Sequence, residues 1–123
     1  MTPRRPKQTG TEGETWVTEY LRQTFPGAHR LAPAGNADIG DIDGLPGCTV
    51  QVKAGRGIHL AEWVDATAQQ AERAGNALFV VVHRRVGRGQ ARIGDWYVTM
   101  PLRVFAPMYT AAAPLVPMPR VRS

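Results

Sequence analysis

The sequence predicts a single α/β domain with a mixed central β-sheet flanked by helices. Apolar residues recur at helical intervals over 11–25 and 58–75, whereas 48–53 and 77–83 have the composition and length of strands. Helical and strand-like segments that alternate along one chain favour a layered α/β fold. A chain of 123 residues has room for one hydrophobic core of modest size, so we expect one folding unit.

The first predicted helix, over 11–25, carries an acid with two open roles. Thr11 and Glu14 have the spacing of a capping box, in which both side chains bond to backbone N–H groups at a helix start. Glu14 also borders the face formed by Val17 and Leu21, so its carboxylate can look into a space between the helix and the sheet. The sequence leaves both a capping role and a site role open.

Three short strands follow, over 28–32, 37–43 and 48–53. The last two form a predicted hairpin, because the residues between them favour turns: Gly44, Pro46 and Gly47. The single cysteine, Cys48, lies on the second strand of this hairpin, where we expect it to pack as a small core residue.

The second half of the domain repeats the alternation. The helix over 58–75 ends at Gly75, because glycine adopts the left-handed conformation that ends many helices. The apolar run 77–83 predicts a central strand buried on both faces, 96–100 predicts another strand, and 101–108 predicts a short helix or turn.

The ends of the chain differ from its middle in composition. Residues 1–9 combine prolines and basic residues and predict a flexible basic arm, ahead of a domain over 10–108. Residues 109–123 hold three prolines without clear periodicity, which predicts an extended or disordered tail.

Charge and composition narrow the classes of partner. Lysine and arginine outnumber aspartate and glutamate by 15 to 10, and this excess predicts attraction to a polyanion, with nucleic acid first. No stretch approaches the roughly 20 apolar residues of a membrane span, and no apolar segment of a signal peptide follows the N-terminus. We therefore expect a cytoplasmic protein without a membrane partner.

The predicted hairpin gathers acids opposite a lysine. Gln51 and Lys53 share one face of their strand, and the hairpin is expected to bring Asp41 opposite them. Oxygen ligands of this kind suit Mg²⁺, which can polarise a phosphodiester and activate a water, while Lys53 offsets the charge that develops on the phosphorus centre. Asp43 precedes a glycine and fits a turn residue, and Asp38 is the reserve candidate for the metal ligand.

These residues carry a family resemblance. Gly10 and Glu14 on the first helix, "GDI" at 40–42 and "QVK" at 51–53 occur in an order and spacing similar to the PD-(D/E)xK nuclease superfamily. Within it, residues 10 to 106 resemble the Holliday junction resolvases of archaeal type and their bacteriophage-encoded relatives.

The resemblance implies a restriction-endonuclease-like fold and a homodimer that cuts four-way or other branched DNA in recombination with Mg²⁺ or Mn²⁺. It assigns catalysis to Glu14, Asp41, Gln51 and Lys53. The implied metal ligands are Glu14, Asp41, Gln51 and the backbone carbonyl of Val52. If the chain is encoded by a phage, the expected compartment is the host cytoplasm.

Two positions depart from the family pattern. Gly40 stands before Asp41 where the family has proline, and Gln51 stands where a glutamate or aspartate is expected. A neutral amide oxygen can coordinate a cation but supplies no charge, so Glu14 becomes necessary. The alternatives are a non-catalytic branched-DNA-binding protein on the same fold, or another nuclease of this superfamily.

A basic segment after the apolar strand is expected to contact DNA phosphates. It includes His83, Arg84, Arg85, Arg88 and Arg92, and the competing interpretation is an ordinary solvated loop. Arg56, soon after Lys53, is better placed to reach the phosphate that is cut. His59 is open to a proton-shuttle role or a plain helix-start role, and Trp63 is expected in the core or a dimer face.

Overall fold

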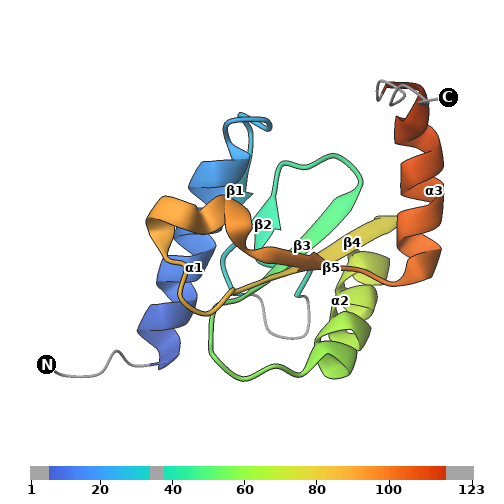
Figure 1. Ribbon diagram of the computed structural model, residues 1–123. Helices are drawn as coiled ribbons and strands as arrows, with labels where there is room; N and C mark the ends of the chain where they lie inside the picture. The colour runs from blue at the N-terminus through green and yellow to red at the C-terminus, as the bar shows by residue number, and fades with distance from the viewer. Residues whose placement is uncertain (1–5, 34–37, 116–123) are drawn as a thin grey trace, which may run out of the picture.

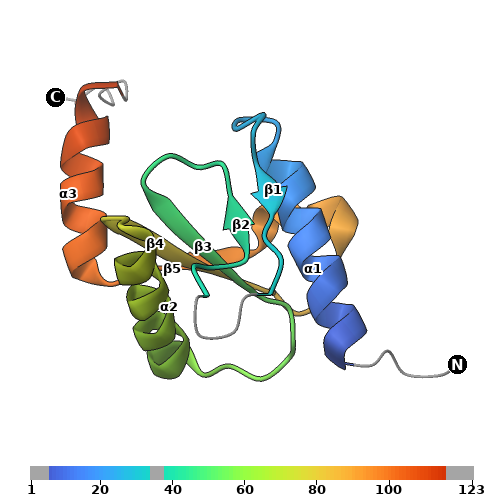
Figure 2. The ribbon, with the colours of Figure 1, turned by 180° about the vertical axis from the view of Figure 1, so that it is seen from behind.

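The chain folds into a five-stranded mixed sheet with helices on both faces (Figures 1 and 2). The computed structural model describes residues 6–33 and 38–115. In chain order the elements are α1 (Pro6–Leu21), β1 (His29–Arg30), β2 (Ile42–Asp43), β3 (Cys48–Lys53), α2 (Leu60–Ala74), β4 (Leu78–His83), η2 (Gln90–Asp95), β5 (Tyr97–Thr99), α3 (Leu102–Ala112) and η3 (Ala113–Leu115). The predicted α/β domain with a mixed sheet is confirmed.

Strand order in the sheet follows chain order, β1-β2-β3-β4-β5. β1, β2 and β3 form an antiparallel meander, α2 then carries the chain across to β4, which runs parallel to β3, and β5 returns antiparallel. The parallel pair extends from Cys48 opposite Leu78 to Lys53 opposite His83. β4 has a strand on each side, as its apolar composition predicts.

Two apolar clusters fill the space between the sheet and its helices. On one face Val50, Val52 and Val82 pack with Val17 of α1 and with Trp96. On the other face Phe79 packs with Ala71 of α2 and Val104 of α3. Period-two alternation along β3 and β4 thus sends successive side chains to different helices.

The predicted helix 58–75 and the strand 48–53 agree closely with the structure. Gly75 ends α2 in the left-handed conformation, with φ of 72°, and the strand matches β3 residue for residue. Cys48 is half-buried against the first cluster, Trp96 is buried and Tyr97 is half exposed. β2 is shorter than predicted, because it pairs only through its last two residues.

The first helix begins earlier than predicted, at Pro6 rather than Thr11. Proline is favoured in the first turn of a helix, where its missing N–H removes no bond. Residues 6–9 of the predicted basic arm are therefore helical, while residues 1–5 lie outside the described chain. Thr11 and Glu14 fall inside the helix, so the capping-box interpretation of Glu14 is wrong.

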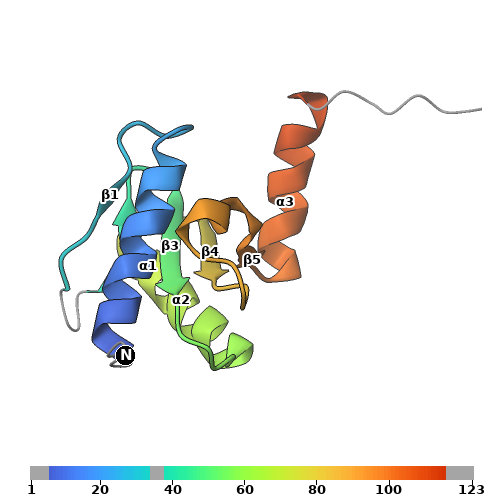
Figure 3. The ribbon, with the colours of Figure 1, turned by 60° about the vertical axis from the view of Figure 1, so that its left-hand side comes forward.

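The predicted extended tail is also wrong over residues 109–115, which continue α3 and form η3. Three consecutive alanines at 111–113 favour helix and outweigh the prolines on either side. Figure 3 shows α3 as the outlying helix of the domain. Residues 116–123 lie outside the described chain, and within the described part no helix combines the length and apolar character that a membrane span requires.

Gly44 of the hairpin allows a stability prediction. Its φ is 98°, and a Cβ at this position would overlap the backbone of Gly27 and Ala28. We expect Gly44→Ala to lower the free energy of unfolding by about 3 kcal/mol or more, because backbone strain and a backbone clash combine. Chemical denaturation measures the change.

Gly47→Ala is the matched control for this hairpin. Gly47 also has a positive φ, 72°, but a Cβ there meets no described atom within 4 Å. Gly47→Ala should lower the free energy of unfolding by only about 1 kcal/mol. Equal losses in the two variants would contradict the close contact between the hairpin and the segment after α1.

Candidate functional site

Asp41 enters β2 through a β-bulge. The Asp41 N–H donates to the Val50 carbonyl at 2.8 Å, yet the register partner of Val50 is Ile42. Asp41 and Ile42 therefore both oppose Val50. A bulge of this kind bends the strand and changes the direction of the Asp41 side chain. Gly40, with φ of 115° and close to the backbone of Val50, allows this approach.

The Asp41 carboxylate is held at the end of the hairpin. Its Oδ2 accepts a hydrogen bond of 2.8 Å from the backbone N–H of Val52, the residue between Gln51 and Lys53. Burial raises the pKa of Asp41 from 3.8 to about 7, and the Glu14 carboxylate adds to this increase, against the Val52 hydrogen bond that lowers it. The site therefore disfavours the negative charge of the Asp41 carboxylate.

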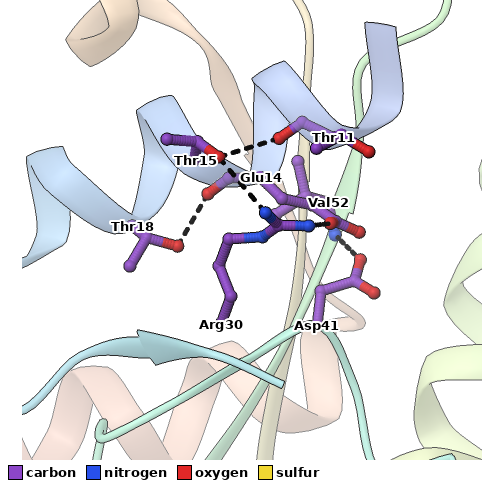
Figure 4. Close-up of polar contacts among 7 residues, drawn as sticks. All are labelled: Thr11, Glu14, Thr15, Thr18, Arg30, Asp41 and Val52. Atoms are coloured by element: carbon purple, nitrogen blue, oxygen red, sulfur yellow. Dashed lines mark hydrogen bonds and ion pairs between the residues drawn. The ribbon is translucent and has the colours of Figure 1, made fainter. Parts of the chain in front are cut away.

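Glu14 reaches this position because α1 lies very close to the end of β3. Gly13 is buried there, and a Cβ on it would overlap the Cβ of Ala54. Glu14 Oε2 pairs with the guanidinium of Arg30 on β1 at 2.7 Å, as Figure 4 shows beside Asp41. Arg30 thus offsets part of the negative charge of Glu14.

These side chains line a hollow of about 190 Å³, which we call the acidic hollow. Its lining consists of Glu14, Arg30, Leu31, Ala32, Pro33, Asp38, Gly40 and Asp41. Mg²⁺ in proteins is commonly held by one or two carboxylates, with waters and substrate phosphates completing its coordination. Of the three acids in this lining, Glu14 and Asp41 offer that number of carboxylates to a cation. No cluster of three His, Cys, Asp or Glu residues suited to a metal occurs in the described ranges.

Asp38, the reserve ligand, has a structural role. Its Oδ1 accepts from the Gly40 N–H at 2.9 Å, and its Oδ2 accepts from Gln70 Nε2 of α2 at 2.8 Å. Arg73 Nε also donates to the Asp38 carbonyl at 2.9 Å. Asp38 therefore ties α2 to the segment before β2.

The structure divides the four predicted catalytic residues between two hollows. Gln51 and Lys53 share a face, as predicted, but they line a second hollow of about 410 Å³ together with side chains of α2, which we call the glutamine hollow. Its lining consists of Gln51, Lys53, His59, Glu62, Trp63, Ala66 and Gln70. The Asp38–Gln70 hydrogen bond joins the walls of the two hollows, and the bulge at Asp41 explains why sequence alternation alone misplaces that residue.

The basic residues after β4 differ in their freedom to bind a phosphate. His83 is buried, with Nε2 bonded to Thr99 Oγ1 at 2.7 Å, and burial lowers its pKa, so the predicted phosphate contact does not fit it. Arg88 and Arg92 both pair with Asp95, at 3.4 and 2.9 Å, and the Arg92 hydrogen bond lowers the pKa of Asp95.

Arg84 and Arg85 are half-buried at the start of the same loop, and Arg56 is exposed after β3. The backbone N–H of Arg84 bonds to the Lys53 carbonyl at 3.0 Å. The backbone of Arg84 therefore lies directly beside Lys53, at the end of β3.

Sequence reasoning missed Arg30 and Gln70. Both act across elements distant in the chain, and neither lies in a recognisable pattern. A scan of known protein families, of curated proteins and of solved structures found no match to this chain.

Proposed function

We propose that the protein is a Mg²⁺- or Mn²⁺-dependent DNA endonuclease of the PD-(D/E)xK type, with a restriction-endonuclease-like fold, that acts on four-way or other branched DNA. The observation that carries the proposal is the half-buried Asp41 carboxylate beside Glu14, next to the β3 backbone that leads to Lys53. A divalent cation would relieve the electrostatic cost of these two acids. The element order, with a helix before an antiparallel meander and a crossover to a parallel strand, agrees with the resemblance.

In this proposal Asp41 and Glu14 hold the cation, with the Val52 carbonyl and the Gln51 amide oxygen as further ligands. The cation would polarise the phosphodiester and lower the pKa of an attacking water. Lys53 stabilises the negative charge that develops on the phosphate. Glu14 must leave Arg30 to bind the cation, so Arg30 competes with the metal.

DNA contacts are proposed for Arg56, Arg84, Arg85 and Arg88, on a chain whose net charge is +5. Arg88 contributes less than the others, because Asp95 already pairs with it. A homodimer would cover apolar side chains that β5 and α3 expose: Tyr97, Val98, Leu102, Phe105 and Tyr109.

A non-catalytic protein that binds branched DNA is the second candidate. The division of the predicted residues favours it, because Glu14 and Asp41 line one hollow while Gln51 and Lys53 line the other. Binding through the basic surface would need neither hollow to hold a metal.

Cleavage of labelled four-way junctions, forks and plain duplex in Mg²⁺ or Mn²⁺ separates the two candidates. We expect cleavage of branched DNA in preference to duplex. Lys53→Ala should lose about 10²-fold in rate, because the charge that develops on the phosphate loses the Lys53 ammonium group. Arg103→Ala is the matched basic control. Arg103 is on α3, packs over the ring of Phe79 and lies outside the proposed site. Binding without cleavage under all metal conditions favours the second candidate, and equal cleavage by wild type and Lys53→Ala contradicts the first.

A further inference from the structure

The glutamine hollow contains a buried amide whose orientation is fixed. Gln70 is only 6% exposed, and its Nε2 donates to the Asp38 carboxylate. A carboxylate accepts hydrogen bonds, so the nitrogen end of the amide must face Asp38 and the oxygen must be the other end. Gln70 Oε1 is buried and has no hydrogen-bond partner among the residues that the structure describes.

A second amide oxygen in the same hollow shares this property. Gln51 Oε1 is also buried, and within the described part of the chain it too lacks a hydrogen-bond partner. Buried polar atoms are rarely left unpaired, because desolvation without a partner is costly. Both oxygens belong to residues that line one hollow, so a ligand there that donates N–H groups would pair them once the two side chains open toward it.

The remaining walls suit a flat aromatic ligand attached to a phosphate. Trp63 is half-buried and is steadied by ring contacts with His59 and His83, whose centroids lie 6.2 and 5.9 Å from its own. Lys53 supplies a positive charge that can pair with a phosphate, while the Glu62 carboxylate in the same lining is a further acceptor for N–H groups. The volume of about 410 Å³ lies within the range of small-molecule pockets, about 300–1,000 Å³.

We propose that the glutamine hollow receives one unpaired nucleobase of branched DNA, stacked against Trp63 and recognised through its amino group by the amide oxygens of Gln51 and Gln70. The inference rests on the proposed function, since it takes the ligand to be DNA. It concerns the complex formed without a cation, in which the Gln51 oxygen is free of its proposed role as a metal ligand. It extends that function by giving the protein a preference for the base at the branch.

The amide oxygens of Gln51 and Gln70 accept hydrogen bonds, and this predicts which base binds best. Cytosine presents an N4 amino donor where thymine presents the O4 acceptor. Thymine O4 would face the two amide oxygens without a hydrogen, so the hollow should favour cytosine. The two pyrimidines are close in size, which makes them a matched pair of ligands.

The test measures binding of the full-length protein to fluorescent DNA in EDTA, where no cutting occurs. Three DNAs are compared: a fully paired four-way junction, and two forked duplexes that differ only in having unpaired cytosines or thymines at the branch. We expect the cytosine fork to bind about five- to tenfold more tightly than the thymine fork. Ala66→Leu, which adds bulk to the hollow from an exposed helix position, should reduce this preference to less than twofold.

Ala61→Leu is the control, because Ala61 is exposed on the same helix and lies outside the described lining of either hollow. It should keep the wild-type preference. Equal binding of the two forks, or a cytosine preference that survives Ala66→Leu, overturns this inference. In either case, tight binding of the paired junction would leave the proposed function standing. Absence of binding to all three DNAs contradicts the proposed function, and this inference with it.

Discussion

Asp41→Asn is expected to stabilise the metal-free protein at pH 8 and to lower metal-dependent cleavage by at least about 10³-fold. Asparagine keeps an oxygen that can accept the Val52 N–H, so the hairpin contact survives. It removes a half-buried negative charge that Glu14 repels. The same charge is the proposed anchor of the cation, which explains why stability and activity should move in opposite directions.

The pH dependence of stability follows from the raised pKa of Asp41. In the folded protein this pKa is about 7, against 3.8 when it is unperturbed, so the folded state binds more protons between these values. The free energy of unfolding should therefore fall as pH rises from about 4 to about 7. At about 1.4 kcal/mol for each pH unit, the contribution of Asp41 is at most about 4 kcal/mol.

Thermal or urea unfolding in EDTA across pH 5 to 8 measures this effect. Wild type should lose stability toward pH 8, Asp41→Asn should flatten the profile, and Mg²⁺ at pH 8 should stabilise wild type alone. Asp43→Asn is the matched control, because Asp43 is exposed in the same hairpin and should leave the profile unchanged. If Asp41→Asn kept the wild-type pH profile of stability, the raised pKa of Asp41 beside Glu14 would be contradicted.

Much of the fold follows from local pattern. The alternation of β3, the apolar run of β4 and the glycine that ends α2 each express a local preference that the tertiary structure leaves intact. The start of α1 and the length of α3 differ from the prediction, because proline does not by itself mark irregular structure at either end. At Pro6 the position in the first turn decides the outcome, and after Tyr109 the run of alanines does.

Some residues of the candidate site could be predicted from the sequence, but their arrangement could not. Alternation correctly puts Gln51 and Lys53 on one face. It cannot reveal the bulge at Asp41, which depends on Gly40 and on a hydrogen bond between strands. Nor can it reveal that Arg30 pairs with Glu14, because their contact depends on how closely α1 lies against the sheet.

Gln51→Glu is expected to act in the opposite direction to Asp41→Asn. The new carboxylate would place a charge where an amide oxygen is now buried without a partner in the described chain. We expect the metal-free protein to lose about 1–3 kcal/mol of unfolding free energy at pH 8, with Lys53 in the same hollow limiting the loss. Affinity for Mg²⁺ or Mn²⁺ should rise about 100-fold, because an anionic ligand replaces a neutral one near a divalent ion.

Calorimetric titration of metal and thermal unfolding with and without metal measure both effects for Gln51→Glu. Gln69→Glu is the matched control, since Gln69 is exposed on α2 and should change neither quantity. Tighter metal binding would mean that Gln51 and Asp41 bind one cation across the Val52 backbone, although they line separate hollows in the structure. Unchanged metal affinity would mean that Gln51 belongs to the glutamine hollow alone, and any metal site would then rest on Glu14 and Asp41.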